Sequence, residues 1–363
     1  MLPAFGTNMK HLLQVYPEET KDTLVRLVRY STNFVTNPLC SLWKTFFVFF
    51  VVNNNTSLKL LSLCFFLSLN ISSFSQSNSI NQYNVVWTTQ SKNSSESMPC
   101  GGGDIGTNVW VENGSIYLYV QQSGWFDENN TALKAGRVKI DLSPNPFAGK
   151  VFKQELKLQD GYINIEGSNG KLKATVKVWV EISNPIVHID VESNQKISAT
   201  AAYETWRYKD RELTGKANNA NSWKWAKHVK VIAPKDSIAF LPYGVTFFHR
   251  NSDSTIFDYA VRQQGLYSYK DSLMNPLGNL ISCGYFLAPH TKPDTVLEGE
   301  YLGVSYKSWQ LKSVAKFKKY KFYIELNRHQ VQPKNEIFTT SFLSSGISPQ
   351  DSSIKWWHNF WNK

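Results

Sequence analysis

From Tyr83 onward the chain is a succession of short segments in which apolar and polar residues alternate, each bounded by turn residues. This alternation has the two-residue period of a β-strand with one buried face. Asn113-Gly114, Asp160-Gly161 and Asn169-Gly170 separate such segments, and these dipeptides favour tight turns between antiparallel strands. The pattern predicts an all-β fold, and it constrains the chain more than any other feature.

The alternating segments also predict how large the β domain is. Strands are predicted at 107–111, 115–121, 136–142, 151–158, 162–166, 172–180, 186–191, 229–232, 237–241, 244–249, 283–287, 301–306 and 321–326. Without a convincing interior helix, this set favours a large two-sheet antiparallel sandwich. Residues 202–227 and 258–280 have weaker periodicity, so we expect long loops or short excursions there.

Two apolar stretches, 45–52 and 60–69, precede the β pattern. Each is shorter than the about 20 apolar residues of a membrane-spanning helix. The second stretch follows Lys59 and ends before Ser73 and Ser75, small residues that fit a signal-peptide cleavage site. We therefore expect a secreted or periplasmic protein with no stable membrane span after the signal is removed. A membrane-anchored form that retains both stretches is the alternative.

The C-terminal end is rich in aromatic side chains, with Trp356, Trp357, Phe360 and Trp361 within eight residues of Lys363. Ser352 and Ser353 can cap a helix that places these rings on one face. A terminal tail offers little surface against which to bury them. The pattern predicts the first turns of a helix that leads into a further domain missing from this chain.

We therefore expect four parts along the chain. Residues 1–51 form an extension outside any domain, which we attribute to a start codon assigned too far upstream, and 52–76 form the signal peptide. Residues 77–330 form the β domain, and 331–363 form a linker followed by the terminal helix.

Charge and cysteine content restrict the function classes. The formal charge of +11 is spread over dispersed lysines, so nucleic-acid binding is not expected. Cys100 and Cys283 are the cysteines of the β domain, and we expect two separate buried thiols rather than a disulfide. The seven histidines lack metal-ligand spacing, so neither a metal nor a cofactor is expected.

A glycine-rich segment, Pro99–Gly106, is the most distinctive motif. It lacks the Lys-Ser/Thr ending of a phosphate-binding loop, and a strand follows it rather than a helix. A tight turn that feeds the strand 107–111 is the favoured interpretation. The structural residues of this turn are Gly101, Gly102, Gly103, Asp104 and Gly106.

Candidate binding residues are aromatic side chains that lie beside carboxylates, amides or an arginine. They are Trp125, Phe126, Asp127, Glu204, Trp206, Arg207 and Trp223. Aromatic faces stack on the C–H surface of sugars, and polar groups bind the hydroxyls, so this composition suits carbohydrate contact. For Trp125 a capped turn with a core tryptophan is the favoured alternative. For the Glu204–Arg207 motif the favoured alternative is a structural salt bridge.

Glycoside hydrolysis requires two carboxylates at a defined separation. Asp104, Asp127, Glu128 and Glu204 are candidates by residue type, but their spacing singles out no pair. We assign no catalytic residue to this chain.

The ordered motifs resemble a known family. They are Trp87, Ser97–Trp110, Asn113–Tyr119 and Gly124–Asp127, and they are similar to the N-terminal domain of inverting glycoside hydrolases of families 95 and 65. The bacterial family catalogued as domain of unknown function 5703 is a closer match. It carries the same turn, the Tyr203–Arg207 motif and the terminal Trp-Trp-x-x-Phe-Trp.

The resemblance covers about residues 80–363 and implies a β-supersandwich similar to galactose mutarotase. It also implies a linker helix and an (α/α)6 barrel that holds the catalytic carboxylates. At Cys100-Gly-Gly the families 95 and 65 usually have Leu-Gly-Asn, so their substrate specificity is not expected to transfer.

The expected function is a structural, carbohydrate-associated N-terminal domain of a secreted glycoside-hydrolase-like protein, truncated before the barrel and inactive alone. Its expected partners are a carbohydrate and the barrel of the full-length relative. A free-standing carbohydrate-binding module that uses Trp125, Phe126, Trp206 and Trp223 is the alternative from another class. A mutarotase-like enzyme is a weaker third hypothesis, because it depends on fold analogy alone.

Overall fold

The computed structural model describes residues 79–214, 231–330 and 348–363, all within one compact unit, Asn78–Lys363. The predictions for the N-terminal extension, the signal peptide and Trp223 fall outside these residues. Within the described ranges, no helix has the length and apolar character needed to cross a bilayer.

Antiparallel strands make up most of this unit. They are β1 (Val85–Trp87), β2 (Met98–Gly102), β3 (Ile105–Glu112), β4 (Ser115–Gln122), β5 (Gly136–Ser143), β6 (Val151–Lys157), β7 (Tyr162–Asn169), β8 (Leu172–Val180), β9 (Ile186–Thr205), β10 (Arg211–Glu212), β11 (Ile232–Ala233), β12 (Ser237–Leu241), β13 (Gly244–Arg250), β14 (Leu280–Leu287), β15 (Thr291–Tyr301), β16 (Val304–Ser313) and β17 (Phe317–Gln330). The α-helices are α5 (Ile256–Gln263) and α6 (Pro349–Trp361), and short 3-10 turns lie at Ile80–Tyr83, Ser94–Glu96, Pro146–Ala148 and Tyr267–Ser272.

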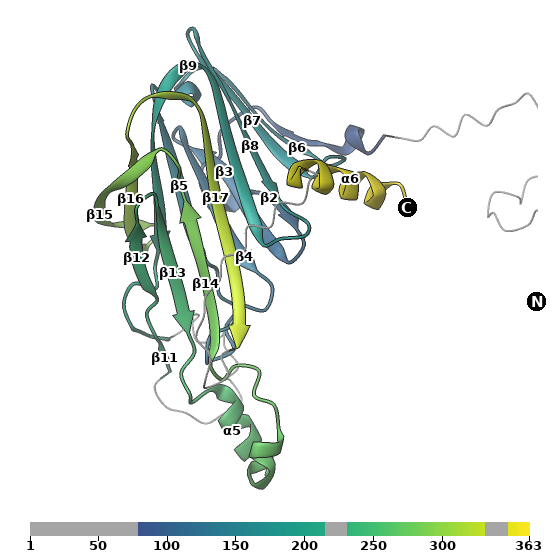
Figure 1. Ribbon diagram of the computed structural model, residues 1–363, viewed down its shortest axis with the longest axis vertical. Coiled ribbons are helices and arrows are strands. Elements are labelled where there is room, and N and C mark those ends of the chain that lie inside the picture. The colour runs from purple at the N-terminus through teal and green to yellow at the C-terminus, as the bar shows by residue number, and fades with distance from the viewer. Residues whose placement is uncertain (1–78, 215–230, 331–347) are drawn as a thin grey trace, which may run out of the picture. The chain divides into compact units, whose positions relative to one another are not determined.

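Apart from β10 and β11, which pair with each other in a small separate sheet, the strands form two sheets that share β9. Sheet A has the order β1-β6-β7-β8-β9-β17-β14-β13-β12, and sheet B has the order β2-β3-β4-β5-β9-β16-β15. The first part of β9 pairs with β8 and β17, whereas its last part pairs with β5 and β16. The long strand therefore passes from one sheet into the other (Figure 1). The predicted all-β class with two antiparallel sheets is confirmed.

The core lies between the two sheets, because each strand presents alternate residues to the other layer. In β4, Ile116, Leu118 and Val120 are buried, while the residues between them are half-buried on the outer face. Sheet A contributes Ile165, Val178, Ile189 and Phe322 to the same apolar cluster.

Three predictions about elements were wrong. The strand predicted at 186–191 continues to Thr205. Its later part alternates small residues, such as Ala199 and Ala201, with Ser and Thr, which gives weak hydrophobic contrast. The strand predicted at 301–306 is interrupted by a turn at Leu302 and Gly303, which have φ of 51° and 79°, so Tyr301 ends β15 and Val304 begins β16.

The third wrong prediction concerns 258–280, where we expected loops or short excursions. Helix α5 begins just before this range, at Ile256, and continues into it to Gln263. Its capping box joins Thr255 and Asp258, each of which satisfies the other's backbone N–H.

A tight turn at Gly103 and Asp104 joins β2 to β3. Of the other predicted turn residues, Gly101 and Gly102 lie in β2 and Gly106 lies in β3, where Gly101 pairs with Gly106. Gly103 has a φ of +57°, a conformation that favours glycine. A Cβ at Gly102 would lie 2.9 Å from the carbonyl oxygen of Val180, so the turn packs closely on the end of β8. The hairpin predicted at Asn113-Gly114 is also present, with both residues at positive φ.

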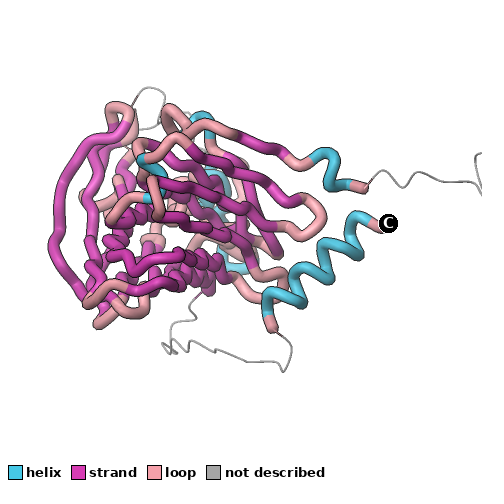
Figure 2. The backbone as a smooth tube through the Cα atoms, turned by 90° about the horizontal axis from the view of Figure 1, so that it is seen from above, coloured by secondary structure: helices cyan, strands magenta, loops and turns pink. Residues whose placement is uncertain are grey.

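Helix α6 forms near the predicted place, but it begins at Pro349 with Ser348 as its N-cap rather than at Ser352 or Ser353. It lies outside the strands in the view from above (Figure 2). The Trp361 indole donates to the carbonyl oxygen of Leu158 at 2.6 Å, and Nε2 of His358 lies 2.8 Å from Oδ1 of Asp160. The helix is therefore attached beside the β6–β7 turn.

Candidate functional site

The outer face of sheet B carries a row of large polar and aromatic side chains. Strand alternation directs apolar residues to the core and leaves these on the other face. Four members of the row stand opposite one another on adjacent strands: Tyr119 on β4, Arg137 on β5, Glu204 on β9 and Ser308 on β16.

The tip of the β15–β16 hairpin reaches over this row. The Tyr301 hydroxyl donates to the Glu112 carboxylate at 2.8 Å and accepts from the Ser94 N–H at 2.8 Å. These two bonds fix the hairpin tip to β3 and to the segment before β2. The space enclosed between the tip and the sheet is a pocket.

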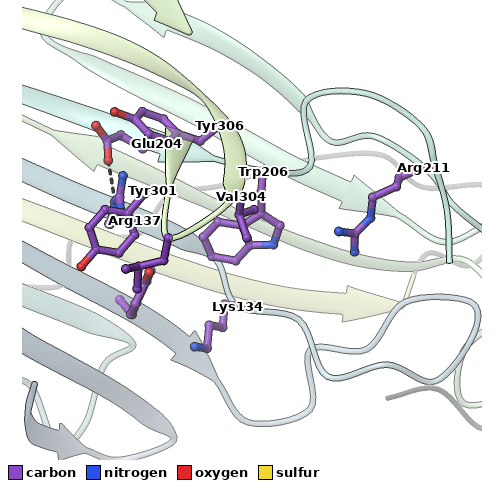
Figure 3. Close-up of a pocket in the computed structure, with 10 residues that line it drawn as sticks. Lys134, Arg137, Glu204, Trp206, Arg211, Tyr301, Val304 and Tyr306 are labelled. Atoms are coloured by element: carbon purple, nitrogen blue, oxygen red, sulfur yellow. Dashed lines mark hydrogen bonds and ion pairs between the residues drawn. The ribbon is translucent and has the colours of Figure 1, made fainter. Parts of the chain in front are cut away.

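This pocket, which we call the Trp206 pocket, has a volume of about 300 Å³. That is at the lower end of the range for small-molecule sites. Its lining consists of Tyr119, Lys134, Arg137, Glu204, Trp206, Arg211, Tyr301, Leu302, Val304 and Tyr306. The indole of Trp206 lies between the Arg137–Glu204 pair and Arg211 (Figure 3).

A buried ion pair forms one wall of the Trp206 pocket. Nε of Arg137 donates to Oε2 of Glu204 at 2.6 Å, and the two side chains are 4 % and 3 % exposed. The guanidinium lies 4.1 Å from the ring centre of Tyr301 and 4.8 Å from that of Tyr306. Burial raises the pKa of Glu204, and the positive charge of Arg137 opposes this rise. The pair and the rings hold each other in place.

Aromatic side chains build the rest of the site. Trp206 follows β9 directly, is half-buried, and contacts the edge of Tyr119 with ring centres 6.0 Å apart. Trp110 lies on the same outer face, opposite Tyr117, but it is fully buried and stacks on Tyr117 with ring centres 5.1 Å apart. Trp206 can therefore contact a ligand, whereas Trp110 supports the rings that line the pocket.

Trp125 lies elsewhere and is only 1 % exposed. Its indole N–H donates to Oε1 of Gln122 at 2.8 Å. The ring has no exposed face with which to contact a sugar, so the structure places it as the core tryptophan of the alternative interpretation.

Phe126 and Asp127 form the capped turn of that same interpretation. Phe126 makes an isolated β-bridge with Ala132. Oδ1 of Asp127 accepts the backbone N–H groups of Asn129 at 3.0 Å and Thr131 at 2.7 Å. Burial raises the pKa of Asp127. Neither residue lines the Trp206 pocket.

Arg207 belongs to a second charged cluster, which we call the His249 cluster. Its guanidinium donates to Asp236, with Nη2 2.6 Å from Oδ2 and Nε 3.0 Å from Oδ1. The His249 ring lies between Asp236, at 3.1 Å, and Glu128, at 3.3 Å. Glu204 and Arg207 are thus both in ion pairs, but with different partners, so the salt bridge considered between these two residues does not form.

The four carboxylates considered for catalysis do not gather around one pocket. Glu204 lines the Trp206 pocket, while Asp127 and Glu128 are buried in the turn and the His249 cluster. Asp104 accepts from Nε2 of Gln122 at 2.9 Å and lines an adjoining pocket of about 250 Å³. Within the part of the chain that the structure describes, no His, Cys, Asp and Glu side chains are grouped to hold a metal ion.

The two body cysteines, Cys100 and Cys283, are free thiols, as predicted, although Cys100 is half-buried. Burial raises the pKa of Cys100 to about 12 and that of Cys283 to about 11, so both are poor nucleophiles.

Sequence reasoning found Glu204 and Trp206 but missed most of the pocket. The missed residues are Tyr119, Lys134, Arg137, Arg211, Tyr301 and Tyr306. One signal was available: Tyr117 and Tyr119 alternate with the core residues of a predicted strand, so they had to lie on its outer face. The contribution of Tyr301 could not be found, because it depends on how the hairpin folds over the sheet.

Comparisons with known proteins give one family and a number of partial structural likenesses, including the following two. The N-terminal family model described as "Domain of unknown function (DUF5703)" matches residues 86–363. A "Putative kojibiose phosphorylase from human microbiome" is 11% identical with a TM-score of 0.33, covering 77% of this chain and 37% of its own. A bacterial glucoamylase complexed with acarbose is 10% identical with a TM-score of 0.28, covering 76% of this chain and 40% of its own.

The chain thus spans at most 40% of the length of these two structures. No curated protein matches it.

Proposed function

We propose a function from the premise that this chain belongs to the DUF5703 family, whose N-terminal domain matches residues 86–363. In this proposal the chain is a carbohydrate-associated β domain of a glycoside-hydrolase-like protein. In this proposal the Trp206 pocket binds a saccharide. The link to glycoside hydrolases is supported by the motifs shared with the N-terminal domains of families 95 and 65.

One observation carries the proposal: the Trp206 pocket combines aromatic surfaces with charged groups that the fold holds in place. Trp206 and Tyr119 offer apolar ring surface, which suits the C–H face of a sugar. Glu204 and Arg137 supply an acceptor and donors beside these rings, and their pairing is fixed within sheet B. Such preorganisation lowers the entropic cost of binding a ligand rich in hydroxyl groups.

The proposal also covers the role of the chain in a larger assembly. We infer that it supports an (α/α)6 barrel, which carries the catalytic carboxylates, and that this chain alone does not hydrolyse glycosides. The proposed signal peptide implies secretion. N-terminal sequencing of the exported protein should give a start near Gln76, and retention of residues 1–51 would contradict this part.

Binding is tested by titrating the full chain with a panel of oligosaccharides by calorimetry. Trp206→Ala should weaken binding about tenfold or more, because it removes the ring on which the sugar would stack. Trp356→Ala is the matched control, since Trp356 is 43% exposed on α6 and does not line the pocket. The proposal fails if no saccharide binds or if both variants bind like the parent chain.

A further inference from the structure

The Trp206 pocket has an unequal balance of charge. Three cationic side chains line it, Lys134, Arg137 and Arg211, against one carboxylate, that of Glu204. Arg137 already neutralises Glu204 through the 2.6 Å contact between them. The other two cations remain without a counter-charge in the lining, so the pocket attracts an anion.

Arg137 keeps donors available although its side chain is buried. Its hydrogen bond to Glu204 uses Nε, and its terminal NH2 groups, Nη1 and Nη2, have no acceptor among the described residues. The plane of the guanidinium is held by the rings of Tyr301, Tyr306 and Tyr117, whose centres lie 4.1, 4.8 and 5.3 Å away. A fixed guanidinium with open amines matches the geometry of a carboxylate or a sulfate.

Lys134 and Arg211 are exposed at the rim of the pocket. The Lys134 ammonium lies 4.5 Å from the ring centre of Tyr119, and no described carboxylate forms an ion pair with Lys134 or Arg211. They can therefore turn toward an anionic group at a small cost, because no existing ion pair has to be broken.

We propose that the Trp206 pocket selects a saccharide with an anionic substituent, either the carboxylate of a uronic acid or a sulfate ester. The inference rests on the proposed function, because it names the class of sugar that the same pocket takes. In this arrangement the anionic group faces Arg137, Lys134 and Arg211, and the sugar ring lies against Trp206.

The adjoining pocket extends the site along the outer face of sheet B. It shares Tyr119 and Lys134 with the Trp206 pocket. Its other lining residues are mainly uncharged: Gly106, Asn108, Val120, Gln121 and Ser123, with Asp104 as the acidic member. An uncharged sugar unit fits this second position, so the ligand is an oligosaccharide whose anionic unit occupies the Trp206 pocket.

The test compares matched pairs of ligands by calorimetric titration of the full chain. One pair is a uronate-containing oligosaccharide and its carboxyl-reduced counterpart, and the other is a sulfated oligosaccharide and its desulfated counterpart. We expect the anionic member of at least one pair to bind about tenfold tighter. This preference should shrink as the salt concentration rises.

Substitutions of two exposed pocket residues test whether the preference for the anionic ligand arises in the Trp206 pocket. Arg211→Ala and Lys134→Ala should each reduce the preference for the anionic ligand several-fold without changing thermal stability. Arg262→Ala and Lys177→Ala are matched controls, because each removes a cation that lies over a tyrosine elsewhere, at 4.7 Å from Tyr267 and Tyr162 respectively. The controls should leave the preference unchanged.

The outcomes separate this inference from the proposed function. If neutral and anionic ligands bind equally, the inference is overturned while saccharide binding stands. If no ligand binds, the proposed function fails as well. A preference that survives both pocket substitutions, or that the control substitutions reduce equally, also overturns the inference.

Discussion

Two charged clusters contain residues close to Trp206 in the sequence, Glu204 in one and Arg207 in the other, and they differ in whether the donors of their arginines are satisfied. Arg137 uses only Nε on Glu204, and its terminal amines have no acceptor among the described residues. Arg207 uses Nε and Nη2 on Asp236 and Nη1 on the carbonyl oxygen of Lys134. Both arginines are largely buried, so burial alone does not distinguish them. The free donors of Arg137 fit the proposed role of the first cluster in binding, whereas the satisfied donors of Arg207 fit a structural role for the second.

The His249 cluster also helps to position a residue of the Trp206 pocket. Nη1 of Arg207 holds the backbone of Lys134 at 2.5 Å, and the side chain of Lys134 lines the Trp206 pocket. The two clusters are therefore linked through one residue. Changes in the His249 cluster should affect stability first, and binding only through the position of Lys134.

The largest effect is expected from Asp236→Ala. This substitution leaves Arg207 and His249 buried without their shared carboxylate, whose side chain is 1 % exposed. Removing one partner of a buried charge cluster costs about 3–5 kcal/mol in the free energy of unfolding. Urea denaturation of the variant and the parent chain measures the difference.

Glu192→Ala provides the control for that experiment. Glu192 pairs with Lys319 at 2.7 Å, but the two side chains are 63% and 72% exposed. An exposed pair of this kind contributes at most about 1 kcal/mol. Equal losses from the two substitutions would show that the His249 cluster is not a structural element.

The second effect concerns pH. Burial lowers the pKa of His249, but its hydrogen bonds to Asp236 and Glu128 outweigh this and raise the pKa from 6.5 to about 9. Because the folded state binds the His249 proton more tightly than the unfolded chain, the stabilisation of the fold by protonated His249 is complete below about pH 6.5. It is lost as the pH rises through about 9, and its size is about 3 kcal/mol.

Unfolding experiments between pH 6 and 10 should therefore show a decline in stability for the parent chain that is smaller in His249→Gln. The charged neighbours of the ring are Asp236, Glu128 and Asp127, and Arg207 acts on it through Asp236. Parallel curves for the two proteins would mean that His249 does not titrate in this range.

The contrast between the two clusters also shows what the sequence could reveal. The all-β class and most strands followed from alternation, since each strand buries every second residue; β8 and β12 have the bounds that were predicted. The extension of β9 to Thr205 was missed because Ala and Thr give weak contrast between the two faces. That extension is what places Glu204 on the outer face of sheet B.

The site itself was only partly predictable. The motif around Glu204 and Trp206 was visible as aromatic and charged residues in close succession. The residues that join them in the pocket are distant in the sequence, with Arg137 from β5 and Tyr301 from the β15–β16 hairpin. Composition also could not separate Trp206 from Trp125, because a core ring and a pocket ring differ in burial and not in residue type.

Within the two clusters, the smallest effect on stability is expected from Glu204→Gln, which tests the Arg137–Glu204 pair. The amide keeps the shape of Glu204 and an acceptor for Nε of Arg137, but it removes the negative charge. Arg137 retains its contacts with the tyrosine rings, so we expect a loss of about 1–3 kcal/mol, below that of Asp236→Ala. The pocket becomes more positive at the same time, so an anionic saccharide should bind at least as tightly as before. If the variant instead unfolds as readily as Asp236→Ala, the Arg137–Glu204 pair is a structural element like the His249 cluster, and the distinction drawn from free donors fails.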